Sequence, residues 1–169
     1  GHFLFIPHLL LSSWNVYQAT NALKAGDMEK ISSLTTEATN DLEKAEYFYT
    51  KILNFKVSER ASNYLFLTLG KKHHDLALQE IKNAEKPSEN AVGLYHFAIE
   101  AKSFKELANL YFKLKNNGIA VSPIDHGISK TLYFSDPDGN GIEVYVDTRS
   151  IRKKWKGLSS IIPEPELKR

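Results

Sequence analysis

The stretch IDHGISKTLYFSDPDGNGIEVYVD, from Ile124 to Asp147, reads as two β-strands joined by a tight turn. Apolar and polar residues alternate from Ile128 to Ser135, and a second strand is predicted from Gly141 to Val146, as is typical of half-buried strands. The sequence DPDGNG between them is dense in residues that favour turn dihedrals. The stretch therefore predicts a β-hairpin, and the rest of the chain is organised around it.

Glu143 lies inside the second of these strands, between Ile142 and Val144. Alternation turns its side chain to the face opposite these two apolar residues. An unpaired buried charge is too costly, so this carboxylate must face water, a partner side chain or a metal ion. A solvated polar face would explain a single glutamate. Here His126 precedes the first strand and Tyr133 lies near its end, so Glu143 is not alone.

Length and composition limit the classes of function. A chain of 169 residues is long enough for one domain, or for two small modules that share a core. The net charge of +2 argues for neither nucleic acid nor an acidic partner. The absence of cysteine excludes disulfides and thiolate metal sites and fits a reducing, cytoplasmic compartment.

The N-terminal sequence GHFLFIPHLLLSSW is apolar but does not predict a membrane segment. The run is too short to span a bilayer, Pro7 and His8 interrupt it, and it lacks the basic flank of a signal peptide. A weakly helical stretch follows from Trp14 to Lys30. We expect residues 1–30 to form an extension that packs on the domain or on a partner subunit.

The order of predicted elements repeats along the chain. The first module, residues 31–86, has a strand from Ile31 to Thr39, a helix with a capping box at Asn40-x-x-Glu43, and strands at Phe55–Glu59, Tyr64–Leu69 and Leu76–Ile81. The second module, residues 91–147, has a strand from Leu94 to Glu100, a helix capped at Ser103-x-x-Glu106 and stopped by Gly118, a strand beginning at Ile119 to Val121, and the hairpin. Residues 148–169 form a C-terminal tail.

The repeat is also visible in the residues of the two helices. Tyr49-Thr50-Lys51-Ile52 in the first matches Tyr111-Phe112-Lys113-Leu114 in the second. Two βαβββ modules are therefore predicted. Modules of this kind can pair their sheets and enclose a cavity lined by inward-facing residues. The expected fold class is α+β, with two βαβββ modules pairing into an open, cavity-forming sheet.

The paired βαβββ pattern, closed by DPDGNGIEVY, resembles the vicinal oxygen chelate superfamily, which includes glyoxalase I, antibiotic thiol transferases and extradiol ring-cleavage dioxygenases. The resemblance covers about residues 31–147 and is strongest to the extradiol dioxygenases. Their signature is a histidine, then Leu-Tyr, then an acidic residue with proline, glycine and a final glutamate. The matching positions are His126, Leu132-Tyr133, Asp136-Pro137, Gly139 and Glu143. The His-His pair of the family is present in the sequence HHDLALQ.

The resemblance implies a role for each matched residue. Glu143 matches a metal-binding carboxylate, and His96, in the sequence LYHFAI, matches a metal-binding imidazole. His74 resembles the acid/base group near the metal, while His126 and Tyr133 resemble the groups that orient the catechol oxygens. In the family, a facial set of two histidines and one carboxylate suits iron(II) because it leaves positions open for a catecholate and dioxygen. A neutral histidine can move a proton, and a tyrosine can hydrogen-bond a developing charge. Iron(II) is the expected cofactor, with another divalent ion as the alternative.

One metal ligand of the family has no counterpart. The first histidine of that set lies on the first strand of the first module, where the internal repeat places Leu34 opposite His96. The other positions considered are Ser33, Thr35, Glu37, His2 and His8. His2 or His8 could complete the set if the N-terminal segment folds in. Two protein ligands alone would hold a divalent ion weakly, so that the metal could be lost or absent.

Three functions stay open on the sequence alone. The first is an extradiol dioxygenase-like oxidoreductase that cleaves a small catecholic ring with dioxygen. The second is a lyase, isomerase or thiol transferase of the glyoxalase type that uses another divalent ion. The third is a protein that binds a small apolar or aromatic ligand without turnover, because its metal site is incomplete. Exposed aromatic residues and the apolar N-terminus also predict a homodimer.

Overall fold

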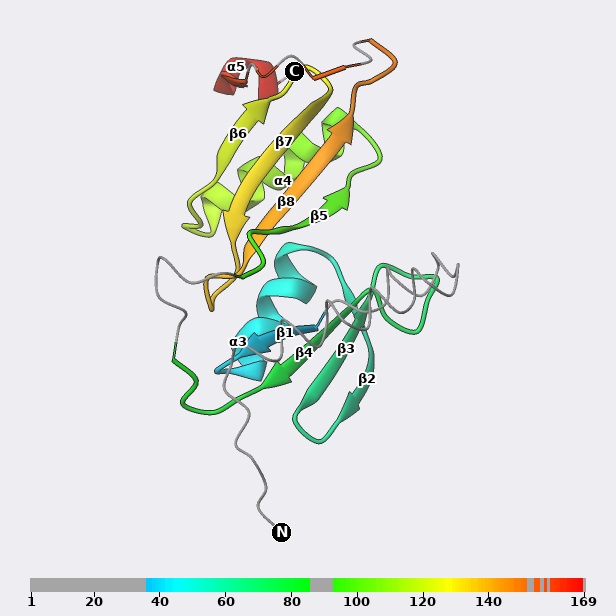
Figure 1. The fold of residues 1–169 in the computed structure, drawn as a ribbon, viewed down its shortest axis with the longest axis vertical. Helices are drawn as coiled ribbons and strands as arrows, with labels where there is room; N and C mark the ends of the chain where they lie inside the picture. The colour runs from blue at the N-terminus through cyan, green and yellow to red at the C-terminus, as the bar shows by residue number, and fades with distance from the viewer. Residues whose placement is uncertain (1–35, 86–92, 152–153, 156, 158, 169) are drawn as a thin grey trace. The chain divides into compact units, whose positions relative to one another are not determined.

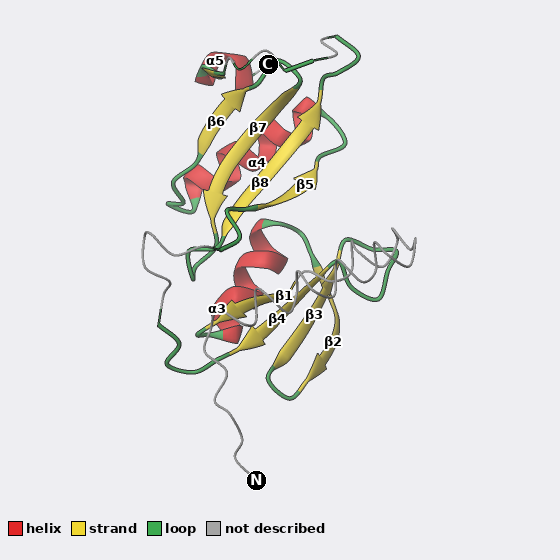
Figure 2. Ribbon diagram, in the orientation of Figure 1, coloured by secondary structure: helices red, strands yellow, loops and turns green. Residues whose placement is uncertain are grey.

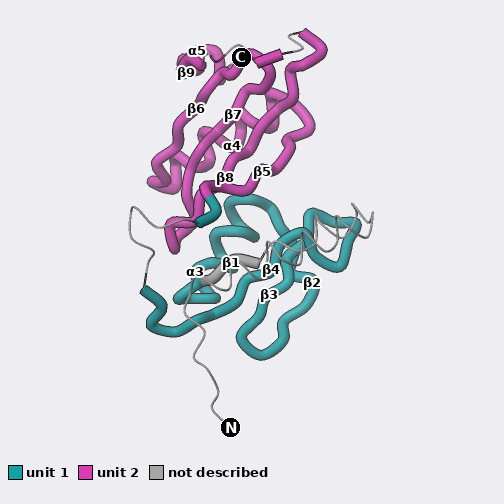
Figure 3. Tube along the Cα trace, viewed as in Figure 1, with its two compact units in different colours: residues 1–94 teal, residues 95–169 magenta. Residues whose placement is uncertain are grey.

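The structure, a computed structural model, describes residues 36–85, 93–151, 154–155, 157 and 159–168. The chain divides into two compact units between Leu94 and Tyr95 (Figure 3). Each unit contains its own open sheet with helices, so the fold is α+β, as predicted (Figures 1 and 2). The predicted N-terminal extension, residues 1–30, lies outside the described residues.

The first unit has the order βαβββ. Its elements are β1 (Thr36–Thr39), α3 (Leu42–Tyr47), a π-helical turn η1 (Phe48–Ile52), β2 (Lys56–Ala61), β3 (Tyr64–Thr68) and β4 (Leu76–Glu80). The sheet order is β1-β4-β3-β2, with β1 parallel to β4 and the other pairs antiparallel. The second to fourth strands lie within two residues of their predicted bounds.

The core of this unit follows from strand alternation and helix periodicity. Leu65 and Leu67 of β3 are fully buried, and so is Leu78 of β4. Ala45 and Tyr49 supply the buried stripe of the helix that contacts the sheet.

The helix cap differs by one residue from the prediction. Asp41, not Asn40, is the N-cap, because its backbone is extended at φ −145° and its carboxylate Oδ1 accepts a hydrogen bond from the Lys44 N–H at 3.0 Å. The side-chain oxygen of Asn40 instead accepts from the backbone N–H of Ala84 at 3.0 Å. Both residues are good caps in sequence, so only the local dihedrals decide between them.

The second unit repeats this order and extends it. Its elements are β5 (Phe97–Glu100), α4 (Phe104–Asn116), β6 (Ser122–Asp125), β7 (Ser129–Ser135), β8 (Gly141–Asp147), β9 (Ser160–Ile161) and α5 (Glu164–Leu167). The sheet order is β5-β8-β7-β6-β9, so its first four strands follow the topology of the other unit. The strand β6 begins at Ser122, after the residues predicted to start it.

Helix α4 lies across one face of this sheet and contacts β7 and β8 (Figure 2). Its predicted cap is confirmed: the Ser103 hydroxyl accepts from the Glu106 N–H at 3.2 Å, and the Glu106 carboxylate accepts from the Lys102 N–H at 2.7 Å. Gly118 follows the helix at φ 70°, the left-handed conformation that glycine adopts without strain. The apolar stripe, fully buried at Leu107 and Leu114, packs in the core.

The C-terminal segment is joined to the second unit. Strand β9 pairs with β6, so that Ile161 lies opposite Ile124. Ile162 and Leu167 are buried, with 1% and 2% of their surface exposed. Glu164 of α5 lies beside the ammonium groups of Lys115 and Lys168, which lower its pKa to about 2.

Every helix in the described part of the chain is too short or too polar to span a bilayer.

Candidate functional site

The turn between β7 and β8 fixes which residues of the hairpin face each other. The buried Asp136 carboxylate accepts hydrogen bonds from the backbone N–H groups of Asp138 at 3.0 Å and Asn140 at 2.8 Å. Gly139 has φ 95°, which a residue with a side chain adopts only with strain. The resulting register places Tyr133 directly opposite Glu143.

The carboxylate of Glu143 is held by hydroxyl groups of the neighbouring strand. Its Oε1 accepts from Thr131 Oγ1 at 2.8 Å and from the Tyr133 hydroxyl at 3.2 Å. Thr131 is fully buried, and the Glu143 side chain is 14% exposed. One carboxylate oxygen is thus occupied by donors from β7, which fixes the direction of the other.

That other oxygen faces an imidazole. His96 immediately precedes β5, which runs parallel to β8, and its Nε2 lies 2.9 Å from Glu143 Oε2. Gly141 makes this approach possible, because a Cβ at that position would lie 2.3 Å from the backbone oxygen of Tyr95 and 3.1 Å from the Cβ of His96. The absence of a side chain at Gly141 therefore places His96 against the hairpin.

The other ring nitrogen of His96 is packed rather than hydrogen-bonded. Nδ1 is buried and has no hydrogen-bond partner among the described residues. The ring meets Tyr133 and Tyr95 edge-on, with centroids 5.3 Å and 5.2 Å apart. The aromatic rings fix the imidazole, and Nε2 is the nitrogen that faces a charged group.

The His96–Glu143 pair has the spacing of two adjacent metal ligands. Metal–nitrogen and metal–oxygen bonds of about 2.1 Å put neighbouring ligand atoms about 3 Å apart, and the observed separation is 2.9 Å. Within the described residues, however, no three metal-ligating side chains gather. The buried Nδ1 also lacks the acceptor that usually supports a ligating histidine. The residues present fit two positions around a divalent ion.

The surroundings of Tyr133 keep its hydroxyl protonated. Burial raises the pKa of Tyr133 to about 12, and the negative charge of Glu143 and the hydrogen bond to it act in the same direction. The hydroxyl is therefore a hydrogen-bond donor throughout the neutral range.

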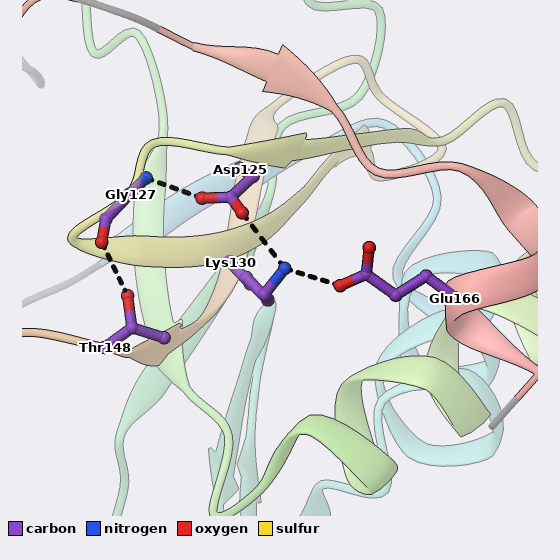
Figure 4. A network of polar contacts seen from close by, with 5 residues as sticks. All are labelled: Asp125, Gly127, Lys130, Thr148 and Glu166. Atoms are coloured by element: carbon purple, nitrogen blue, oxygen red, sulfur yellow. Dashed lines mark hydrogen bonds and ion pairs between the residues drawn. The ribbon is translucent and has the colours of Figure 1, made fainter. Parts of the chain in front are cut away.

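His126 reaches this group from the loop between β6 and β7. Its Nε2 lies 3.1 Å from the Tyr133 hydroxyl, and its Nδ1 lies 2.7 Å from Ser159 Oγ. The next residue, Gly127, is held on both sides: its N–H donates to the Asp125 carboxylate at 2.6 Å, and its carbonyl accepts from Thr148 Oγ1 at 3.1 Å (Figure 4). The loop is fixed where it presents the imidazole.

A lysine connects this loop to the C-terminal helix. Lys130 Nζ lies 3.0 Å from the Asp125 carboxylate and 2.6 Å from that of Glu166 (Figure 4). Partial burial of the ammonium opposes its charge, but the hydrogen bonds to Glu166 and Asp125 raise the pKa of Lys130 above its ordinary value. A cavity of about 310 Å³ beside this network is lined by Asp125, Lys130 and Ser159, among others, and not by His96 or Glu143.

His74 belongs to the first unit. Its Nδ1 lies 2.8 Å from Nδ1 of His73, whose Nε2 lies 2.8 Å from the Glu59 carboxylate, and the ring of Phe66 packs against both imidazoles. The other four predicted site residues gather in the second unit. Leu34 and the other positions considered for a third ligand lie outside the described residues, except Glu37, of which only the backbone is described.

Two residues that contact the predicted site residues of the second unit, Thr131 and Ser159, were not predicted from the sequence. Thr131 lies two positions before Tyr133 on β7, so strand alternation places both on the face of Glu143 and could have identified it. Ser159 has no comparable signal, because it lies outside any periodic stretch and meets His126 only through tertiary contacts.

The chain is similar to known proteins in both sequence and fold. Residues 35–144 match the family model of the Glyoxalase/Bleomycin resistance protein/Dioxygenase superfamily. Catechol-2,3-dioxygenase of Bacillus subtilis is 41% identical over 116 residues, which cover 68% of this chain and 40% of that protein. Biphenyl-2,3-diol 1,2-dioxygenase 2 of Rhodococcus globerulus is 32% identical over 114 residues, which cover 66% of this chain and 60% of that protein. The chain thus spans only part of the length of these curated relatives.

Solved structures agree on the fold. The crystal structure of the fosfomycin resistance protein FosX from Listeria monocytogenes matches 70% of this chain and 93% of its own, with a TM-score of 0.55 and 21% identity. At that identity the likeness concerns the fold alone.

Proposed function

The chain belongs to the glyoxalase/bleomycin resistance protein/dioxygenase superfamily, and from that premise we propose that it acts as an extradiol dioxygenase-type oxidoreductase. The substrate is a small catecholic ring, which is cleaved with dioxygen at a divalent metal. The similarity to two ring-cleavage dioxygenases supports this choice within the superfamily. The observation that carries it is the contact between His96 Nε2 and Glu143 Oε2 at 2.9 Å, with Tyr133 beside it.

Each side chain has a task in this proposal. His96 and Glu143 would hold the metal, iron(II) by family precedent, which when bound would supply the redox chemistry that lets a catechol react with dioxygen. Thr131 and Tyr133 orient the Glu143 carboxylate through its Oε1, which leaves Oε2 directed toward His96. Tyr133 and His126 present hydrogen-bonding groups for a substrate oxygen. His74 is proposed, on the family resemblance alone, as the group that accepts and returns a proton.

The test is reconstitution of the chain with iron(II) under anaerobic conditions, followed by a panel of catechols and then air. Cleavage of the ring gives a yellow product that absorbs visible light, and its rate should be proportional to bound iron. A matched sample of Glu143→Gln shows how much colour is independent of the site. Iron bound at one equivalent with no colour from any catechol would contradict the proposal.

A second candidate is a member that binds a small aromatic ligand without turnover. It is favoured by the presence of only two metal-ligating side chains, His96 and Glu143, at the site within the described residues. Metal analysis of protein purified without chelators separates the two. Bound iron favours the dioxygenase, whereas protein that takes up no divalent ion but binds catechols favours the second candidate.

A further inference from the structure

A line of polar contacts runs from the C-terminal segment into the candidate site. Ser159 Oγ lies 2.7 Å from His126 Nδ1, and His126 Nε2 lies 3.1 Å from the Tyr133 hydroxyl. The Tyr133 hydroxyl in turn lies 3.2 Å from Glu143 Oε1. Ser159 is thus connected to the proposed metal ligand through two intervening side chains.

The direction of the protons along this line follows from what each group can donate. An ionised carboxylate can only accept hydrogen bonds, so the single hydroxyl proton of Tyr133 is donated to Glu143. The Tyr133 oxygen can then only accept, and the donor facing it is Nε2–H of His126. A neutral imidazole protonated at Nε2 has a bare Nδ1. The group that faces this bare nitrogen is the hydroxyl of Ser159, which has a proton to donate.

We propose that Ser159 is a positioning residue that holds His126 in the tautomer with its proton on Nε2. His126 then faces the site as a hydrogen-bond donor, and its bare nitrogen is turned away toward Ser159. The importance of this for ring cleavage rests on the function proposed above, whereas the tautomer itself does not. Ser159 acts through His126 and contacts neither Glu143 nor His96.

The backbone that carries Ser159 is fixed by its neighbours. The next residue begins β9, which pairs with β6, and the N–H of Ile162 donates to the Pro123 carbonyl at 3.0 Å. Ile162 is 1% exposed, so its burial fixes this segment on the unit. Glu166 of α5 adds the ion pair to Lys130 (Figure 4). These contacts hold the hydroxyl where His126 can use it, although Ser159 itself is exposed.

The tautomer can be read directly by nuclear magnetic resonance. Long-range 1H–15N correlation spectra of 15N-histidine-labelled full chain, at about pH 8.5, distinguish the protonated nitrogen of each neutral imidazole, and His126→Gln identifies the signals of His126. The wild type should show His126 protonated at Nε2. In Ser159→Ala, the share of the Nδ1–H form should rise about fivefold, the population change that one ordinary hydrogen bond produces.

Two matched variants test the cause. Ser159→Thr keeps the hydroxyl and should keep the wild-type tautomer, and Ser160→Ala, the next residue on the same segment, should change nothing at His126. Equal melting temperatures exclude unfolding as the cause. A wild-type His126 protonated on Nδ1 or on both nitrogens, or an unchanged His126 in Ser159→Ala, would overturn the inference. Catechol cleavage is measured separately, so a chain that fails to cleave catechols contradicts the proposed function while the tautomer still decides this inference.

Discussion

His96 Nε2 lies 2.9 Å from Glu143 Oε2, and His96 immediately precedes β5, which pairs in parallel with β8, the strand that carries Glu143. The pair is set by three local features: the turn that ends in Gly141, the hydroxyls that occupy the second carboxylate oxygen, and the rings that fix the imidazole. Each of these features can be changed separately by substitution.

Glu143→Gln removes the charge of the proposed metal ligand and keeps its size. An amide is a much poorer ligand for a divalent cation than a carboxylate, so the affinity for cobalt(II), used as a stable probe, should fall at least about 10-fold by titration calorimetry. Glu100→Gln makes the same change at an exposed position on β5 and should leave the affinity intact. Equal affinities in the two variants would show that Glu143 does not bind the metal.

Gly141→Ala introduces a Cβ where the backbone oxygen of Tyr95 already lies 2.3 Å away. The strand start that carries His96 must move, so the free energy of unfolding should fall by about 1–3 kcal/mol in urea denaturation. Gly93→Ala is the matched control, because its Cβ would meet nothing within 4 Å. A stable Gly141→Ala variant with wild-type metal affinity would contradict the account of how His96 is placed.

Tyr133 should be among the last tyrosines to ionise in the metal-free chain. Its pKa of about 12 predicts that Tyr133→Phe removes a component of the ultraviolet titration well above pH 10. Because the folded-state pKa is raised above the ordinary 10.0, its contribution to stability is fully present below pH 10 and is lost as the pH rises toward 12. The wild type should therefore lose stability more steeply than Tyr133→Phe over that range. Parallel curves would refute the raised pKa.

Lys130→Met removes the cation between Asp125 and Glu166 and keeps much of the apolar stem. The C-terminal segment should then open more often, and the N–H of Ile162 should exchange with deuterium about twofold to fivefold faster. Lys105→Met, at an exposed position on α4, serves as the control. No change in exchange at Ile162 would mean that burial alone holds the segment.

Local sequence rules were sufficient for most of the fold. Alternation in the hairpin, the Ser103 cap and the Gly118 stop each depend on residues within a few positions, and the structure has them where the sequence predicts them. The cap at Asp41 was missed because two adjacent residues carry equally suitable side chains. The βαβββ order in both units also followed from periodicity and its repetition.

The sequence by itself determined which face of the hairpin carries Glu143 and Tyr133, because side chains alternate with a period of two. Only the tertiary structure decided that His96 meets Glu143, since that contact needs parallel pairing between separate strands and a glycine at the crossing. It also decided that the C-terminal segment brings Ser159 to His126. No periodic pattern encodes such contacts, because they depend on how distant elements pack rather than on the spacing of residues along the chain.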